Sequence, residues 1–227
     1  MIDFSKFELS KSDADAFQSL VGPEGLWKKK QLDQLKLIQE VGLSHTDSVL
    51  ELGCGPIRFG CGLIDYLNTG CYQGIDIREE SISQANLLVK KFDLNNKSPF
   101  LSTSDDFGLD VIQKDSIDFI WAFNVLIHLS EPLLIRSFYA ISKLLKIDGR
   151  AIFTIRISKE QGFKKTGEWQ DYPISCASFD YLAEVADECG LIFSLFRPIS
   201  SLTHANKKQS PCYYLAGLRH KQAYDFI

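Results

Sequence analysis

The sequence predicts an α/β protein built on a doubly wound, mainly parallel sheet. From about residue 48, apolar runs of strand length alternate with segments of helical periodicity. These runs are nearly continuous, as expected for strands whose two faces are both covered by helices, and right-handed crossovers then connect them. We expect seven strands, the last antiparallel, at residues 48–52, 71–77, 99–104, 116–123, 150–157, 191–199 and 212–221.

Four helices are expected between these strands. Each shows apolar residues at helical spacing, as in the stripe Ile82, Ala85, Leu88 and Val89. Gly149 is expected to mark a turn before the fifth strand. The predicted helices cover residues 58–67, 79–92, 131–146 and 179–190.

Composition excludes several classes of protein. The 227 residues are 45% hydrophobic and 24% charged with a net charge of −4, so no basic field favours nucleic acid or an anionic membrane. No signal-peptide layout and no apolar run of about 20 residues is present, which predicts a cytoplasmic protein. The six cysteines include no C-x-x-C pair, so we expect buried thiols and no metal site.

The stretch VLELGCGPIRFG, residues 49–60, carries the first functional signal. In an open α/β sheet, ligands bind beyond the carboxyl ends of the strands, and glycines there let a ligand approach the backbone. Asp76 ends the second predicted strand, where a carboxylate accepts hydrogen bonds from both ribose hydroxyls. A nucleoside-containing ligand is therefore expected.

Two such ligands compete. A dinucleotide favours G-x-G-x-x-G, but Arg58 stands at the place of the last glycine. S-adenosylmethionine carries no phosphate and needs no pyrophosphate cradle.

The order of motifs resembles the class I, Rossmann-like S-adenosylmethionine-dependent methyltransferases. VLELGCGPIRFG is similar to their first motif, YQGIDIREESISQA to their second, SIDFIWAFNVLIHLSE to the motif of their fourth strand, and LLKIDGRAIFTI to the turn before their fifth. The resemblance implies a methyltransferase whose cofactor is S-adenosylmethionine. Its implied cofactor-binding residues are Glu51, Gly53, Cys54, Gly55, Asp76, Ile77, Asp105, Asp106, Phe107, Phe123 and Asn124, with the choice between the two adjacent aspartates left open.

The acceptor is expected to be a small molecule or a sugar, methylated at oxygen rather than nitrogen. The Asn-Pro-Pro-Tyr/Phe motif of amino-directed relatives is absent, because Asn124 is followed by Val125-Leu126. His128 is the candidate base for a hydroxyl acceptor, since imidazole titrates near neutral pH, although a histidine at this place more often only shapes the pocket. The candidate substrate-binding residues are Arg58, Trp169, Tyr172 and His204, and a role for Arg58 in bracing the glycine loop stays open.

The chain is expected to divide into a helical N-terminal lid, residues 1–46, and the cofactor-binding domain, residues 47–227. Asp13 is expected to cap a first short helix, and Leu32, Leu35 and Ile38 to cover the site from a second one. The polar, aromatic segment 159–177 is expected to be an irregular insertion on the substrate side.

Two alternatives remain open. Ile57 replaces the third glycine of G-x-G-x-G, and no base is certain, so a non-catalytic domain that binds S-adenosylmethionine or a partner protein is possible. An NAD-dependent oxidoreductase is disfavoured by Arg58. The oligomeric state is left open.

Overall fold

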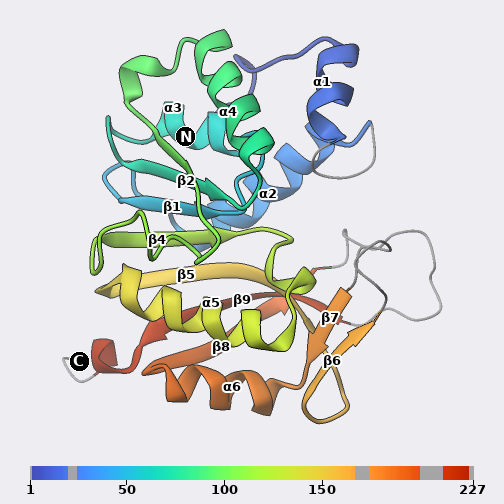
Figure 1. Cartoon of the computed structure of the whole chain (residues 1–227), viewed down its shortest axis with the longest axis vertical. Helices are drawn as coiled ribbons and strands as arrows, with labels where there is room; N and C mark the ends of the chain where they lie inside the picture. The colour runs from blue at the N-terminus through green and yellow to red at the C-terminus, as the bar shows by residue number, and fades with distance from the viewer. Residues whose placement is uncertain (1, 20–24, 167–173, 200–211, 225–227) are drawn as a thin grey trace. The chain divides into compact units, whose positions relative to one another are not determined.

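The computed structural model describes residues 2–19, 25–166, 174–199 and 212–224. The chain divides into two compact units, residues 1–105 and 106–227 (Figure 1). Within the described residues, no helix is both long and apolar enough to cross a bilayer.

The first unit holds a parallel three-stranded sheet in the order β3-β2-β1. Its strands are β1 (Val49–Leu52), β2 (Tyr72–Asp76) and β3 (Phe100–Thr103). The helices α3 (Gly60–Tyr66) and α4 (Glu79–Lys91) connect them. The predicted stripe Ile82, Ala85, Leu88 and Val89 is the buried side of α4, which confirms the helical reading of that segment.

Two N-terminal helices belong to the same unit, α1 (Lys11–Gln18) and α2 (Trp27–Val41). The predicted cap at Asp13 is wrong: Ser10 is the N-cap of α1, and its hydroxyl accepts from the Asp13 amide at 3.1 Å. The predicted apolar face of α2 is only partly correct. Ile38 is buried but Leu32 is 43% exposed, and the buried side of α2 consists of Trp27, Gln31, Gln34, Leu37 and Ile38.

The second unit holds the strands β4 (Ile117–Ala122), β5 (Leu145–Ile157), β8 (Leu191–Pro198) and β9 (Cys212–His220) in the order β4-β5-β9-β8. β4 and β5 are parallel, and β9 runs antiparallel to both of its neighbours. The predicted antiparallel last strand is confirmed. It lies between β5 and β8, not at the edge of the sheet.

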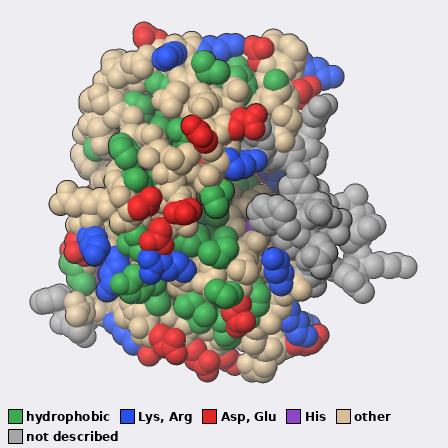
Figure 2. Space-filling model, in the orientation of Figure 1, with side chains coloured by type: hydrophobic (Ala, Val, Ile, Leu, Met, Phe, Trp, Pro, Cys, Tyr) green, Lys and Arg blue, Asp and Glu red, His purple; other side chains and the backbone are tan. Residues whose placement is uncertain are grey.

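Two helices, α5 (Glu131–Leu144) and α6 (Phe179–Glu188), lie on one face of these strands (Figure 1). Phe138 of α5 and Phe179 of α6 both contact the ring of Phe193 on β8. The outer side of α5 exposes hydrophobic residues, among them Leu133 and Tyr139, and Figure 2 shows such side chains interspersed with charges of both signs. No single-sign field covers the described surface in this view.

The segment 159–177 is more regular than predicted. Its described parts include β6 (Phe163–Thr166) and β7 (Ile174–Ala177), which pair antiparallel, and β7 continues the sheet beside the end of β5. The described parts of the chain therefore hold more strands than the seven predicted. Gly149 is also not a turn but part of β5, where a Cβ would lie 2.8 Å from the Ile117 carbonyl oxygen of β4.

Candidate cofactor and acceptor sites

A loop in left-handed backbone conformation follows β1. Gly53, Gly55 and Ile57 have φ values of 66°, 55° and 50°, and the Cys54 amide donates to the Ile75 carbonyl of β2 at 2.9 Å. Gly53 is exposed, so a ligand can approach its backbone closely. Ile57 adopts a conformation that is strained for a β-branched residue, and its side chain is fully buried.

Asp76 joins this loop to the end of β2. Its Oδ2 accepts from the Gly55 amide at 3.0 Å, and its Oδ1 accepts from the Arg78 amide at 3.0 Å. The side chain is 7% exposed. Arg78 Nε makes a longer contact of 3.5 Å with Oδ1. A carboxylate offers about four acceptor positions, so these contacts leave capacity for ligand hydroxyls.

Ile77 follows directly and is 71% exposed, the largest exposure among the apolar side chains described. A buried carboxylate beside an exposed apolar side chain fits a nucleoside, whose ribose is polar and whose base is a flat apolar surface. Gly55 and Asp76, linked by a hydrogen bond, thus lie close in sequence to the exposed Gly53 and Ile77 in the first unit.

Glu51 lies beneath the loop and is 5% exposed. Burial raises its pKa to about 7, although the Tyr72 hydroxyl donates to its Oε2 at 2.6 Å and the Arg58 cation opposes the shift. Gly60 makes room for this pair, because a Cβ there would lie 2.3 Å from the Tyr72 hydroxyl oxygen. Near neutral pH the carboxyl group is therefore poised between two protonation states.

Cys54 contributes its backbone to the loop. Burial raises the pKa of its thiol well above the ordinary value, so the sulfur stays neutral. Within the described residues no group of acidic, histidine and cysteine side chains has the arrangement of a metal site.

Arg58 fastens the loop to the N-terminal helices. Its Nη1 donates to Gln18 Oε1 at 3.0 Å, and its carbonyl oxygen accepts from Gln31 Nε2 at 2.8 Å. Burial lowers the pKa of its guanidinium to about 10, which leaves it charged. Sequence reasoning missed Gln18, Gln31 and Tyr72, since buried polar residues carry no pattern that separates them from surface ones.

The adjacent aspartates after β3 differ in their partners. Asp106 accepts two hydrogen bonds of 2.6 Å from Arg136, and this contact lowers the pKa of its carboxyl group. Asp105 is exposed. Phe107 has a φ of 54° and is half-buried.

In the second unit, Phe123 and Asn124 directly follow β4, as predicted. The Asn124 amide donates to Thr154 Oγ1 of β5 at 2.8 Å, which fixes a residue with a φ of 59° at the carboxyl end of the strand. Phe123 is 9% exposed and stacks on Trp121 at a centroid distance of 6.3 Å. His128 follows at the end of a short 3-10 helix (Leu126–His128).

This helix is held near the carboxyl end of β5. The His128 amide donates to the Val125 carbonyl at 3.0 Å, and the hydroxyl of Ser175 on β7 donates to the Leu129 carbonyl. The structure thus brings Asn124 and His128 to one edge of the second unit. Trp169, Tyr172 and His204 lie outside the described residues.

The first unit has a parallel sheet with a glycine loop after β1 and an acid at the end of β2, and the second has an antiparallel β9 beside β5. These are the features of a nucleoside-binding α/β protein of the methyltransferase type. Comparison with known families agrees. Residues 43–209 match the family model described as a methyltransferase domain. The chain belongs to this family, and it is a class I S-adenosylmethionine-dependent methyltransferase with S-adenosylmethionine as its methyl donor.

Solved structures show the same fold. A protein of Pyrococcus horikoshii OT3 matches at 17% identity and TM-score 0.64, covering 94% of this chain and 100% of that one. An S-adenosylmethionine-dependent methyltransferase of Clostridium acetobutylicum ATCC 824 matches at 15% identity and TM-score 0.63, with 92% and 98% covered. No curated protein matches the chain in sequence.

Two further similar structures are an N-methyltransferase and an O-methyltransferase. The glycopeptide N-methyltransferase MtfA complexed with S-adenosylmethionine matches at 11% identity and TM-score 0.60, covering 84% of this chain and 93% of that one. The mitomycin 7-O-methyltransferase MmcR matches at 15% identity and TM-score 0.57, covering 84% and 53%. At these sequence identities the similarity shows a shared fold and no more.

Proposed function

We propose that this enzyme transfers the methyl group of S-adenosylmethionine to an oxygen atom of a small molecule or sugar. The observation that carries the proposal is the position of His128 at the carboxyl edge of β4 and β5, beside the Asn124–Thr154 contact. A hydroxyl acceptor needs a base that titrates near neutral pH, and imidazole is such a base. The small-molecule and glycopeptide methyltransferases among the similar structures support the acceptor class.

Residues of the first unit would hold the cofactor. Asp76 would accept hydrogen bonds from the ribose hydroxyls, Ile77 would cover the adenine, and Gly53 and Gly55 would approach the cofactor through their backbone. Glu51 would face the positive charges of the methionine part. Of the two aspartates, Asp105 is the better candidate for the adenine amino group, because Arg136 already occupies both oxygens of Asp106.

The cofactor supplies an electrophilic methyl group on a sulfonium centre. The protein's part is to orient the acceptor in line with that group, exclude water and take the hydroxyl proton on the imidazole of His128. Residues 1–46 would act as a lid, with Gln18 and Gln31 linking it to the glycine loop through Arg58.

The proposal is tested by incubating the pure protein with methyl-labelled S-adenosylmethionine and a fractionated metabolite extract. We expect a labelled small product whose methyl group is shown by NMR to be an ether or ester, and no product with Asp76→Ala. An N-methyl product would overturn the assignment to oxygen. Tight cofactor binding without any labelled product would favour the non-catalytic alternative.

A further inference from the structure

We infer that the acceptor carries an anionic group, a carboxylate or phosphate, which Arg156 binds at the carboxyl end of β5. This inference rests on the proposed function, because it names the chemical class of the acceptor for the same site. It starts from a cation in the second unit that has no counter-charge among the residues that the structure describes.

Arg156 lies on the same side of β5 as Thr154, two residues further along the strand. Thr154 contacts Asn124 at the end of β4, so Arg156 stands about 6–7 Å closer to the carboxyl edge. Its guanidinium lies 5.6 Å from the centre of the ring of Tyr213, the residue of β9 that faces Arg156 in the antiparallel β5–β9 pair. Stacking on this ring leaves the edge of the guanidinium available to a planar acceptor.

The guanidinium is partly removed from water. Desolvation by burial is the main cause that lowers the pKa of Arg156, and its Nε is buried without a hydrogen-bond partner among the described residues. Burying a cation whose N–H has no acceptor costs free energy, and a bound anion offsets that cost by accepting the hydrogen bond. Tyr213 does not supply that anion, because burial raises its pKa to about 12.

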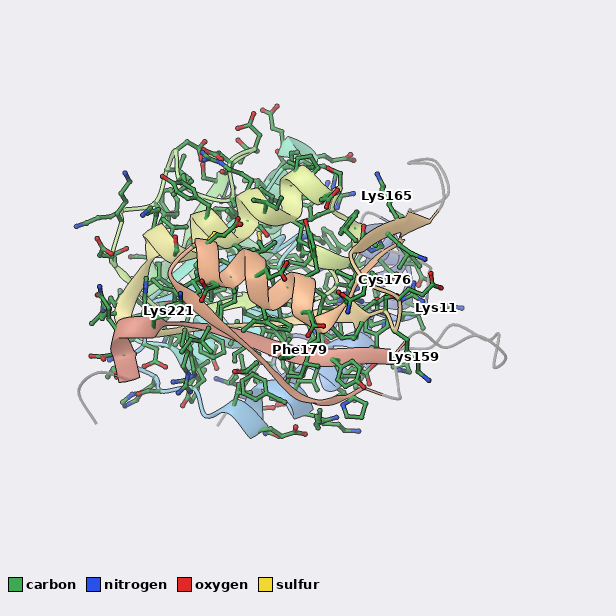
Figure 3. The ribbon with its side chains drawn as sticks, turned by 90° about the horizontal axis from the view of Figure 1, so that it is seen from below. Lys11, Lys159, Lys165, Cys176, Phe179 and Lys221 are labelled. Carbon is green, nitrogen blue, oxygen red and sulfur yellow. The ribbon has the colours of Figure 1, made fainter. Side chains whose placement is uncertain are left out.

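Acidic side chains before β6, on α6 and on α5 are engaged with other residues. Glu160 pairs with Lys164, Asp180 accepts from Gln161 at 3.1 Å, and Glu131 accepts from Tyr181 at 2.7 Å. Figure 3 shows Lys165 on β6 and Lys159 just beyond the end of β5, with Cys176 between them in this view, and neither lysine has a partner among the residues that the structure describes.

This arrangement indicates two roles. Arg156 would form a charge-assisted, bidentate contact with the anion, while Lys159 and Lys165 would raise its local concentration through longer-range attraction. The net charge of the whole chain is −4, so the attraction for an anion is local to this end of β5.

Binding is tested with inorganic phosphate as the probe. In protein labelled with ¹⁵N-arginine, we expect phosphate to shift the Nε–H signal of Arg156 in a saturable way, while sodium chloride at equal ionic strength does not. The Nε–H signal that is missing from the spectrum of Arg156→Lys is the signal of Arg156. The Arg219 signal is the matched control, since Arg219 is an exposed arginine at the opposite end of β9.

An Arg156 signal that does not respond to phosphate, or responds no more than that of Arg219, would overturn the inference. The chain's own carboxylates are a competing source of the anion. If Glu168→Gln with Asp171→Asn shifts the Arg156 signal in the absence of phosphate, an internal ion pair replaces the proposed ligand and the inference fails.

Activity separates this inference from the proposed function. Labelled product from the extract should be retained on an anion exchanger, and Arg156→Met should raise KM for that acceptor by about tenfold or more with a smaller effect on kcat. Arg219→Met should leave both constants unchanged. A labelled but neutral product would overturn the anionic acceptor and leave methyl transfer intact, whereas the absence of any labelled product would count against both.

Discussion

The Asp76 carboxylate accepts a hydrogen bond from the Gly55 amide at 3.0 Å, so the end of β2 is tied directly to the glycine loop after β1. The same carboxylate holds the Arg78 amide, at the turn into α4. A single buried acid therefore fixes the loop and presents its remaining acceptor positions to a ligand.

Asp76→Ala should weaken binding of S-adenosylmethionine by more than tenfold, because a hydrogen bond from a neutral group to a charged one contributes about 1.5–3 kcal/mol. It should also destabilise the loop, since the Gly55 amide loses its acceptor. Calorimetric titration measures the first effect and thermal unfolding the second. Asp118→Ala is the control, because Asp118 is a carboxylate paired with Lys146 near the start of β4. Unchanged cofactor affinity in Asp76→Ala would move the ribose site elsewhere.

Gln31→Ala should lower the free energy of unfolding by about 1–2 kcal/mol, because the Arg58 carbonyl would lose its donor in a partly buried place. Affinity for S-adenosylmethionine should fall with it, as the Arg58 peptide follows the glycine loop. Gln39→Ala, on the exposed side of the same helix, should change neither quantity. Equal effects of the two variants would argue that α2 has no link to the loop.

Replacing Ile57 by glycine changes two opposing contributions to the free energy of unfolding. Ile57→Gly relieves a left-handed backbone that costs a residue with a Cβ about 1–2 kcal/mol. It also removes a fully buried side chain, and truncating a buried isoleucine costs about 2–5 kcal/mol. The loss of burial outweighs the relief of strain, so the variant should unfold at lower denaturant concentration than the wild type. A more stable variant would show that backbone strain dominates the loop.

Glu51 makes stability depend on pH in a defined direction. Its pKa rises from 4.5 to about 7 on folding, so the folded state holds the proton more tightly than the unfolded state. The resulting stability is present below pH 4.5 and is lost as pH rises toward 7, and a shift of this size corresponds to about 3 kcal/mol. Glu51→Gln, which mimics the protonated form, should lose this pH dependence, so the difference in Tm between variant and wild type should grow from pH 5 to pH 8.

Cofactor binding should change the same equilibrium. If the positive charges of S-adenosylmethionine lie near Glu51, binding at pH 7 should release on the order of half a proton. Calorimetry in two buffers of different ionisation enthalpy measures this release. Glu51→Gln should abolish it, and a wild-type protein that releases no proton would place the charged end of the cofactor away from Glu51.

Sequence reasoning succeeded where local pattern and tertiary environment agree. The apolar strands and the stripe of α4 are fixed by burial, which leaves a periodic trace in the sequence. It failed for α2, where Gln31 and Gln34 replace apolar residues on the buried side, and Gln31 there supplies a polar partner to Arg58. Such exchanges depend on contacts between segments distant in the chain, and no local pattern encodes them.

The same limit applies to the candidate site. The loop and Asp76 in the first unit, and Asn124 in the second, could each be placed at the carboxyl end of a strand from the order of the predicted strands. The choice between Asp105 and Asp106 could not, since it depends on Arg136 of α5, 30 residues away in sequence from Asp106. Arg156 was also missed, because in sequence it is an arginine in an apolar strand, and only burial distinguishes it.

Substitution of His128 distinguishes a catalytic role of its imidazole from a structural role at the carboxyl end of β4 and β5. If its imidazole takes the proton of a hydroxyl acceptor, His128→Gln should lower kcat by about 10²–10⁴ and leave the Kd of S-adenosylmethionine nearly unchanged. The wild-type profile of kcat against pH should rise as the imidazole loses its proton, and that ascending limb should disappear in the variant. Ser175→Ala is the matched control, because it removes the hydrogen bond to the Leu129 carbonyl, the residue after His128, and keeps the imidazole. It should lower kcat modestly and preserve the shape of the profile.

A His128→Gln enzyme within threefold of the wild type on the true acceptor would exclude the imidazole as the base. The methyltransferase assignment would stand, since it rests on the family match and on the glycine loop with Asp76.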